Sequence, residues 1–243
     1  MIVFFTQILA VFRKEIWMYK NSTIAFVFLF AGVVLAGIFF FIGIITTQLA
    51  SMQFLVKNLS LSLLFLTPIL TMHLISSERQ SGTLEMLLNS PLSIWSIILG
   101  KWLSTLFLCM ILLALCCFFP ILLQFYTQID WMDVFLSMGS VFFCFSVFSS
   151  LGLFAASFFQ DRVSSVIGGI FVLLPLWLCG IMEPFLGDGI LAQICQEISF
   201  SYHVTRISSG LIEISDVFWF GSLSLFWLYA TYMRLSSYGW RMS

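Results

Sequence analysis

Long stretches without Asp, Glu, Lys or Arg constrain this chain more than any other feature. They cover residues 21–56, 58–77, 102–129, 134–160, 163–182 and 217–233. A helix needs about 20 residues to cross the hydrocarbon core of a bilayer. Each stretch therefore predicts one crossing, with spans at about 23–45, 58–76, 102–125, 134–158, 163–182 and 217–234. The expected fold is an all-α polytopic membrane protein, because continuous apolar runs exclude the alternating pattern of a membrane β-barrel.

The composition supports lipid as the main solvent. Hydrophobic residues make up 61% of the 243 residues and charged residues only 9%, whereas a soluble domain carries about 25% charged residues. The net charge of −1 gives no electrostatic case for nucleic acid as a partner. The six cysteines show no CxxC spacing, so we expect inert thiols and no bound metal.

The first 20 residues form an amphipathic pattern. Apolar side chains recur at helical spacing at Phe5, Ile8, Leu9, Phe12, Ile16 and Tyr19. The positive charges follow the first apolar residues instead of preceding them, which is not the order of a cleavable signal. The pattern predicts a helix in the membrane interface, although an amphipathic leader with no special role would look the same.

Positive charges predict the orientation. With a cytoplasmic N-terminus, the inner segments hold Arg13, Lys14, Lys20, Arg79, Lys101, Arg162, Arg234 and Arg241, and the outer loops hold only Lys57 and Arg206. Cytoplasmic loops are enriched in Lys and Arg. We therefore expect both termini and residues 78–101 in the cytoplasm. The outer segment 183–216 is too long for a turn, and it contains an apolar helical face at Ile190, Leu191, Ile194 and Ile198. It predicts a re-entrant or interfacial outer helix.

Residues 78–92 form a compact polar segment between the second and third spans. Gly82 is expected as the helix N-cap, and Glu85 then falls near the positive helix end. Leu84, Leu87 and Leu88 form an apolar ridge at i, i+3, i+4 spacing. Such a helix could fit a cleft on a soluble partner, or it could be an amphipathic connector on the membrane surface.

The same segment resembles the signature of ABC-2 type permeases. The matching residues are Glu78-Arg79, Gly82-Thr83-Leu84-Glu85, Leu87-Leu88, Pro91-Leu92-Ser93 and Leu99-Gly100-Lys101. The resemblance extends to the interfacial N-terminal helix, the six spans and the outer helix, so it covers nearly all of 1–243 as a single transmembrane domain. Near the C-terminus, a second group resembles the gliding-motility-associated branch: Tyr202-His203, Arg206, Gly210, Ile212 and Asp216-Val217.

The resemblance implies an exporter permease of a bacterial cytoplasmic (inner) membrane, with a second permease chain and a separate ATP-binding subunit as partners. ATP and Mg would be bound by that partner, and this chain would hold no cofactor. The residues implied to dock on the ATPase are Glu78, Arg79, Gly82, Thr83, Leu84, Glu85, Leu87, Leu88 and Pro91. Gly100 and Lys101 would anchor the third span. Tyr202, His203, Arg206 and Asp216 would belong to the outer segment.

Two other classes of function fit the sequence less well. A self-sufficient secondary transporter or channel usually places ionisable residues inside its spans, and the middle of each predicted span has none. An intramembrane enzyme lacks candidate catalytic groups, because neither HExxH nor GxSxG occurs. Gly100-Lys101 is not a phosphate-binding loop, since Trp95 and Trp102 occupy the positions where Walker A needs Gly and Ser or Thr. We therefore expect no ATPase site in this chain.

Overall fold

The computed structural model describes residues 2–47, 52–88, 90, 92–125, 130–159, 161–182, 189, 195–209 and 214–239. These ranges contain helices and no strand, which confirms the all-α prediction. The helices are α1 (Ile2–Lys20), α2 (Thr23–Thr47), α3 (Met52–Gln80), α4 (Thr83–Leu88), α5 (Ile94–Cys116), α6 (Phe118–Gln124), α7 (Trp131–Phe158), α8 (Arg162–Met182), α10 (Phe200–Ser208) and α11 (Ile214–Gly239).

Five helical segments are long and apolar enough to cross a membrane: Thr23–Thr46, Met52–Gln80, Ile94–Gln124, Trp131–Phe158 and Arg162–Met182. They overlap the first five predicted spans. The sixth predicted run lies in α11, which has 26 residues but is not among the five. Five of the six expected crossings thus correspond to long apolar helices in the described part of the chain, and the sixth stays a prediction.

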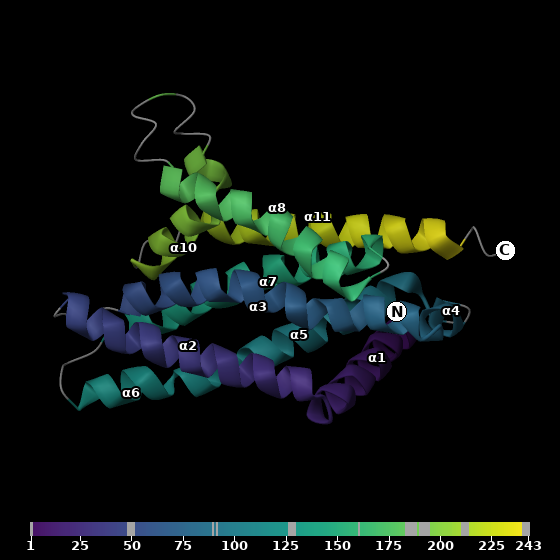
Figure 1. The fold of residues 1–243 in the computed structure, drawn as a ribbon, viewed down its shortest axis with the longest axis horizontal. Helices are drawn as coiled ribbons and strands as arrows, with labels where there is room; N and C mark the ends of the chain where they lie inside the picture. Colours follow the sequence, from purple (N-terminus) through teal and green to yellow (C-terminus); the bar gives the residue numbers. More distant parts are fainter. Residues whose placement is uncertain are drawn as a thin grey trace.

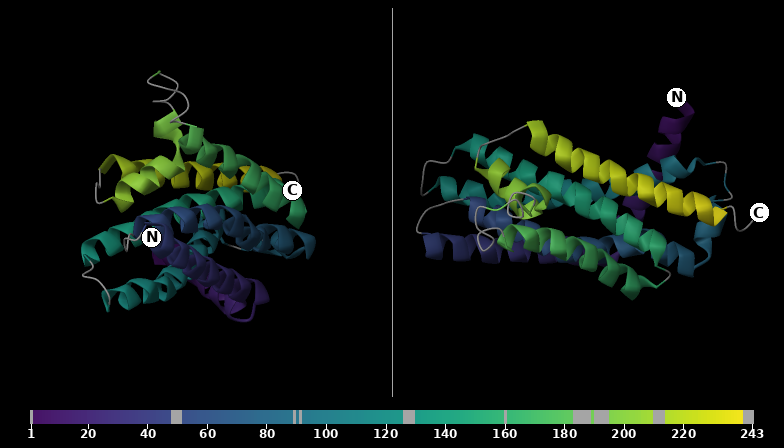
Figure 2. Two further views of the ribbon diagram at one scale, coloured as in Figure 1. Left: turned by 60° about the vertical axis from the view of Figure 1, so that its left-hand side comes forward. Right: turned by 90° about the horizontal axis from the view of Figure 1, so that it is seen from above.

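Helices α3 and α7 form the centre of the bundle, with α8 and α11 on one side and α2 and α5 on the other (Figures 1 and 2). Small residues permit this packing. A Cβ added at Gly152 of α7 would lie 2.2 Å from the Thr71 hydroxyl oxygen of α3. A Cβ at Gly169 of α8 would lie 3.2 Å from the Cβ of Pro68. Larger side chains at either glycine would force the helices apart.

The third span differs from its predicted form. Helix α5 begins at Ile94, about two turns before the predicted start at 102, so Gly100 and Lys101 lie within it. The helix ends at Cys116, and α6 resumes at Phe118. Pro120 explains the break, because proline has no N–H to bond the carbonyl of residue 116 and its ring clashes with that carbonyl.

The two ends of the bundle carry different elements. Helix α1 crosses the bundle obliquely at the end that also holds α4 and the last turns of α11 (Figure 1). Helix α10 lies at the opposite end, beside the ends of α8 and α7 (Figure 1). The apolar helical face predicted at 190–198 falls mostly outside the described residues, and only its last part, residues 195–198, is seen as helix.

Candidate functional site

Helix α4 is short and is tied to the end of α3. Gly82 has a φ of +71°, so it closes a tight turn directly before α4. Gly82 directly precedes Thr83, the first residue of α4, so it occupies the predicted N-cap position, with a left-handed backbone in place of the more usual extended one. The Thr83 hydroxyl donates to the carbonyl of Glu78 at 3.2 Å, and the Ser81 hydroxyl donates to the same carbonyl. These bonds hold α4 against the last turn of α3.

The apolar side of α4 faces the bundle. Leu84 is only 1% exposed, and it packs in a cluster of side chains from α3, α5, α7 and α11: Leu74, Ile75, Ile98, Leu153, Ala156, Leu228 and Leu235. The prediction that Leu84 belongs to an outward ridge is wrong, because a helix of six residues is stable only when tertiary packing supports it. Glu85 is exposed, Met86 is 77% exposed and Leu87 is half-buried.

A buried ion-pair network lies at the junction of α1, α3 and α5. Lys101 Nζ lies 2.9 Å from Glu15 Oε1 and 2.8 Å from Glu78 Oε2. Lys14 Nζ lies 2.8 Å from Glu78 Oε1 and 3.9 Å from Glu15 Oε1. We call these four residues the charge quartet. Its two positive and two negative side chains balance, and Lys14 is the half-exposed member of the four.

Three of the four side chains in the charge quartet are buried, so the loss of any one partner would destabilise the fold. The side chains of Lys101 and Glu15 are each 2% exposed, and that of Glu78 is 7% exposed. The third interaction of the Lys101 ammonium is a hydrogen bond to the carbonyl of Leu74 at 2.6 Å. Although Glu78 and Lys101 bound the segment expected in the cytoplasm, both side chains are shielded from solvent. In the sequence, these charges interrupt the apolar pattern. In the structure, they pair with one another inside the bundle instead of facing solvent.

Tyr19 lies at the edge of this junction. Burial raises the pKa of its hydroxyl well above the ordinary value, and the nearby Glu15 carboxylate raises it further. Tyr19 therefore stays neutral and adds no charge to the quartet.

Arg79 connects the same turn of α3 to α7. Its guanidinium donates to the carbonyls of Ser157 at 2.9 Å and Phe159 at 3.2 Å. The last carbonyls of a helix have no partner within the helix, and a cation at this end also interacts favourably with the helix dipole. Arg79 thus caps α7 from α3, while its neighbour Glu78 reaches α1 and α5.

We predict that Arg79→Gln lowers the free energy of unfolding by about 1.5–3 kcal/mol, the usual contribution of hydrogen bonds from a charged group. Thermal unfolding of the purified protein in detergent measures the change. Lys57→Gln is the matched control, because Lys57 is exposed at the other end of the same helix. Equal unfolding temperatures for the two variants would contradict a capping role for Arg79.

Gly100 allows α1 to approach α5 closely. A Cβ at this position would lie 2.7 Å from the Cβ of Val11 and 3.2 Å from the carbonyl oxygen of Ile8. Val11 is buried on the face of α1 that also carries Glu15. Gly100 and Lys101 therefore join the third span to α1, by close packing and by charge respectively. This finding gives the predicted anchor a physical basis.

The opposite end of the bundle holds a second polar cluster. The Asp216 carboxylate is fully buried, with His203 Nδ1 2.6 Å away and Arg206 Nε 3.1 Å away, and Arg206 Nη2 contacts it as well. The other ring nitrogen of His203 lies 3.1 Å from the carbonyl of Glu197. The Arg206 guanidinium stands over the Tyr202 ring at 5.4 Å. The four residues predicted for the outer segment are thus brought together, and they join α10 to α11.

The sequence analysis assigned neither Lys14 nor Glu15 to the site. The available signal was that Glu15 is the single acidic residue in the amphipathic segment 1–20, one helical turn after Val11. Two predicted docking residues have no described side chain: Leu88, whose backbone ends α4, and Pro91, which lies outside the described residues. Within the described ranges, no group of three or more His, Cys, Asp or Glu side chains could hold a metal.

The long apolar helices define an integral membrane protein. A sequence model of the family described as "ABC-2 family transporter protein" matches residues 61–234, which include α4, most of α3 and all the helices between α5 and α10. The chain belongs to the ABC-2 transporter family, and so to the membrane permease components of ABC transporters. A comparison with curated proteins finds no match.

Proposed function

We propose that this chain is the permease subunit of an ATP-driven exporter and that it receives work from a separate ATP-binding subunit through α4. In this proposal ATP and Mg are bound by the partner, and two permease chains enclose the membrane pathway. Helix α11 is the sixth crossing, and both termini lie in the cytoplasm of a bacterial inner membrane. The outer residues Tyr202, His203, Arg206 and Asp216 favour, by resemblance, the gliding-motility-associated branch.

The observation that carries this proposal is that the neighbouring residues Glu78 and Arg79 contact different helices. These two residues come directly before the turn into α4, and they bond in different directions. Glu78 pairs with Lys14 of α1 and Lys101 of α5, and Arg79 bonds to the end of α7. A displacement of α4 therefore acts on three helices through short polar contacts. A connector lying passively on the membrane surface would need none of these bonds.

The surface that α4 offers to a partner is smaller than the sequence predicted. Glu78 and Leu84 face inward, and Arg79 is bonded to α7, so these three residues support α4 from behind. Thr83, Glu85 and Met86 are exposed. We propose that these three, with Leu87, form the docking surface, and the roles implied for Leu88 and Pro91 stay predictions.

ATP can drive the conformational change only if it binds one state of the transporter better than the other. A ligand shifts a conformational equilibrium only if it binds one state better than the other. ATP held between two closed ATP-binding subunits would meet this condition. Closure would move the two docked α4 helices, and the charge quartet and Arg79 would carry that movement to α1, α5 and α7. The pairing of every charge in the quartet also argues against a proton or ion relay, which would require a group that exchanges protons with water.

The proposal requires α4 to face the compartment that supplies ATP. We expect a cysteine at position 86 to be shielded from an impermeant thiol reagent added outside cells, and a cysteine at position 132 to be labelled. Met86 and Met132 are 77% and 61% exposed. Met86 lies in α4, and Met132 lies in the first turn of α7, at the end of that helix opposite the one that Arg79 caps. Both variants are made in a chain whose native cysteines are replaced by alanine. The reverse labelling pattern would overturn the proposed coupling.

A further inference from the structure

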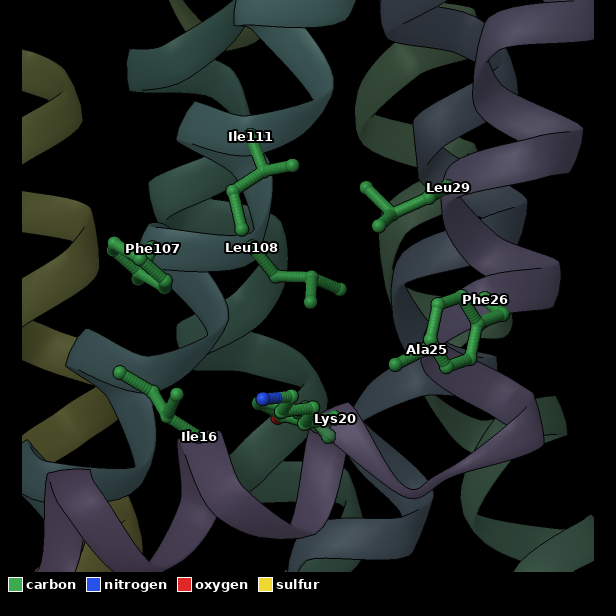
Figure 3. A pocket seen from close by; sticks show the side chains of 9 residues that line it. Ile16, Lys20, Ala25, Phe26, Leu29, Phe107, Leu108 and Ile111 are labelled. Carbon is green, nitrogen blue, oxygen red and sulfur yellow. The ribbon is translucent and has the colours of Figure 1, made fainter.

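An apolar groove opens where α1 turns into α2. It has a volume of about 260 Å³ and is lined by the end of α1, the start of α2 and the middle of α5 (Figure 3). The lining side chains include Ile16, Lys20, Phe26, Leu29, Phe107 and Ile111. Almost all of the lining surface is hydrocarbon, and Lys20 is the one charged residue among those that line it. The groove is smaller than a drug-sized site, so it fits a length of one acyl chain.

Lys20 places a positively charged residue at one end of the apolar groove. It is the last residue of α1, and Figure 3 shows its side chain at the end of the groove where α1 meets α2. No carboxylate of the described residues pairs with it, since Glu15 is bound to Lys101 and Lys14. A cation beside hydrocarbon suits a ligand that has an apolar tail and an anionic head.

A second observation extends the positive charge along α1. Arg13, Trp17 and Lys20 fall at i, i+4 and i+7, so they lie on one face of the helix. All three are exposed, and Trp17 is 68% exposed. Tryptophan is enriched at the membrane–water interface, and clustered Lys and Arg next to it attract anionic lipid headgroups. We therefore expect this face of α1 to lie at the level of the lipid phosphates.

We propose that the groove between α1, α2 and α5 binds one acyl chain of a phospholipid whose anionic headgroup lies against Lys20 and Arg13. The bound lipid would fill the space between α1, α2 and α5, next to Ile16 and Tyr19. It would thereby hold α1 in the position where Glu15 meets Lys101. This inference concerns a structural lipid and is independent of what the chain transports.

The test compares lipid binding by the full-length protein, with Lys20→Gln, Ile111→Trp and Lys57→Gln as variants. Ile111→Trp fills the groove without changing charge, and Lys57→Gln removes an exposed cation at the far end of α3. Native mass spectrometry counts the phosphatidylglycerol retained after purification in a neutral detergent. Thermal unfolding is then measured in phosphatidylcholine nanodiscs with and without phosphatidylglycerol.

We expect the wild type and Lys57→Gln to retain phosphatidylglycerol and to unfold at a higher temperature when it is present. Lys20→Gln should retain about fivefold less, the usual effect of one cation at an anionic surface. Ile111→Trp should also lose retention, with unchanged helix content by circular dichroism. Three results would overturn the proposal: equal retention by Lys20→Gln, equal stabilisation by phosphatidylcholine alone, or the same stabilisation by inorganic phosphate. A groove closed by a second copy would appear as dimers that dissociate in Ile111→Trp, and it too would overturn the proposal.

Discussion

Lys101→Met is expected to lower the free energy of unfolding by about 3–5 kcal/mol, the range seen when one partner of a buried ion pair is removed. Methionine keeps much of the length and apolar character of the lysine side chain, so packing changes little. The loss leaves Glu15 and Glu78 buried with only the half-exposed Lys14 between them, and it removes the bond to the Leu74 carbonyl. Thermal or denaturant unfolding in a fixed detergent measures the effect.

A double-mutant cycle separates the charge interaction from packing. If Glu15 and Lys101 interact directly, Glu15→Gln combined with Lys101→Met should cost less than the sum of the two single changes, because residues in one ion-pair network are not additive. Lys57→Met, at an exposed position, should change stability by less than about 0.5 kcal/mol. Strict additivity of the two quartet changes would show that the quartet does not act as a unit.

Much of the fold followed from the distribution of charge along the chain. The uncharged runs located α2, α3, α7 and α8, because a bilayer sets the length of a crossing helix. The third uncharged run predicts one span that starts at residue 102, whereas the structure has two helices there, α5 and α6, and α5 begins at Ile94. Ser93 caps α5 by accepting from the backbone N–H of Ser96 at 3.2 Å, and this local bond starts the helix well before the charge-free stretch begins.

The candidate site was harder to predict, because its residues come from distant parts of the sequence. The resemblance pointed to Glu78 and Lys101, but it could not say that they meet each other. Glu15 is separated from Lys101 by 86 positions along the chain, and a single acidic residue in an amphipathic helix normally faces water. Only the packing of α1 on α5, permitted by Gly100, turns Glu15 inward. Burial of Leu84 likewise depends on α11, which the pattern of α4 does not encode.

Glu85→Arg combined with Met86→Arg is expected to abolish recovery of the ATP-binding subunit with an affinity-tagged chain. Both side chains lie on the exposed side of α4. A contact residue at the centre of an interface typically contributes about 2 kcal/mol or more, which corresponds to roughly a thirtyfold change in affinity. Because neither residue is buried, the unfolding temperature of the isolated double variant should stay that of the wild type.

Two comparisons make this result specific. Met132→Arg introduces the same charge at an exposed methionine in the first turn of α7, far from the end of that helix that Arg79 caps, and it should leave recovery of the ATP-binding subunit unchanged. Arg79→Gln should also keep the partner bound while reducing ATP-dependent transport, because Arg79 acts behind α4 on the end of α7. Recovery of the partner by the Glu85/Met86 double variant would place docking elsewhere. Full transport by Arg79→Gln would mean that force reaches the bundle only through the charge quartet and the packing of Leu84.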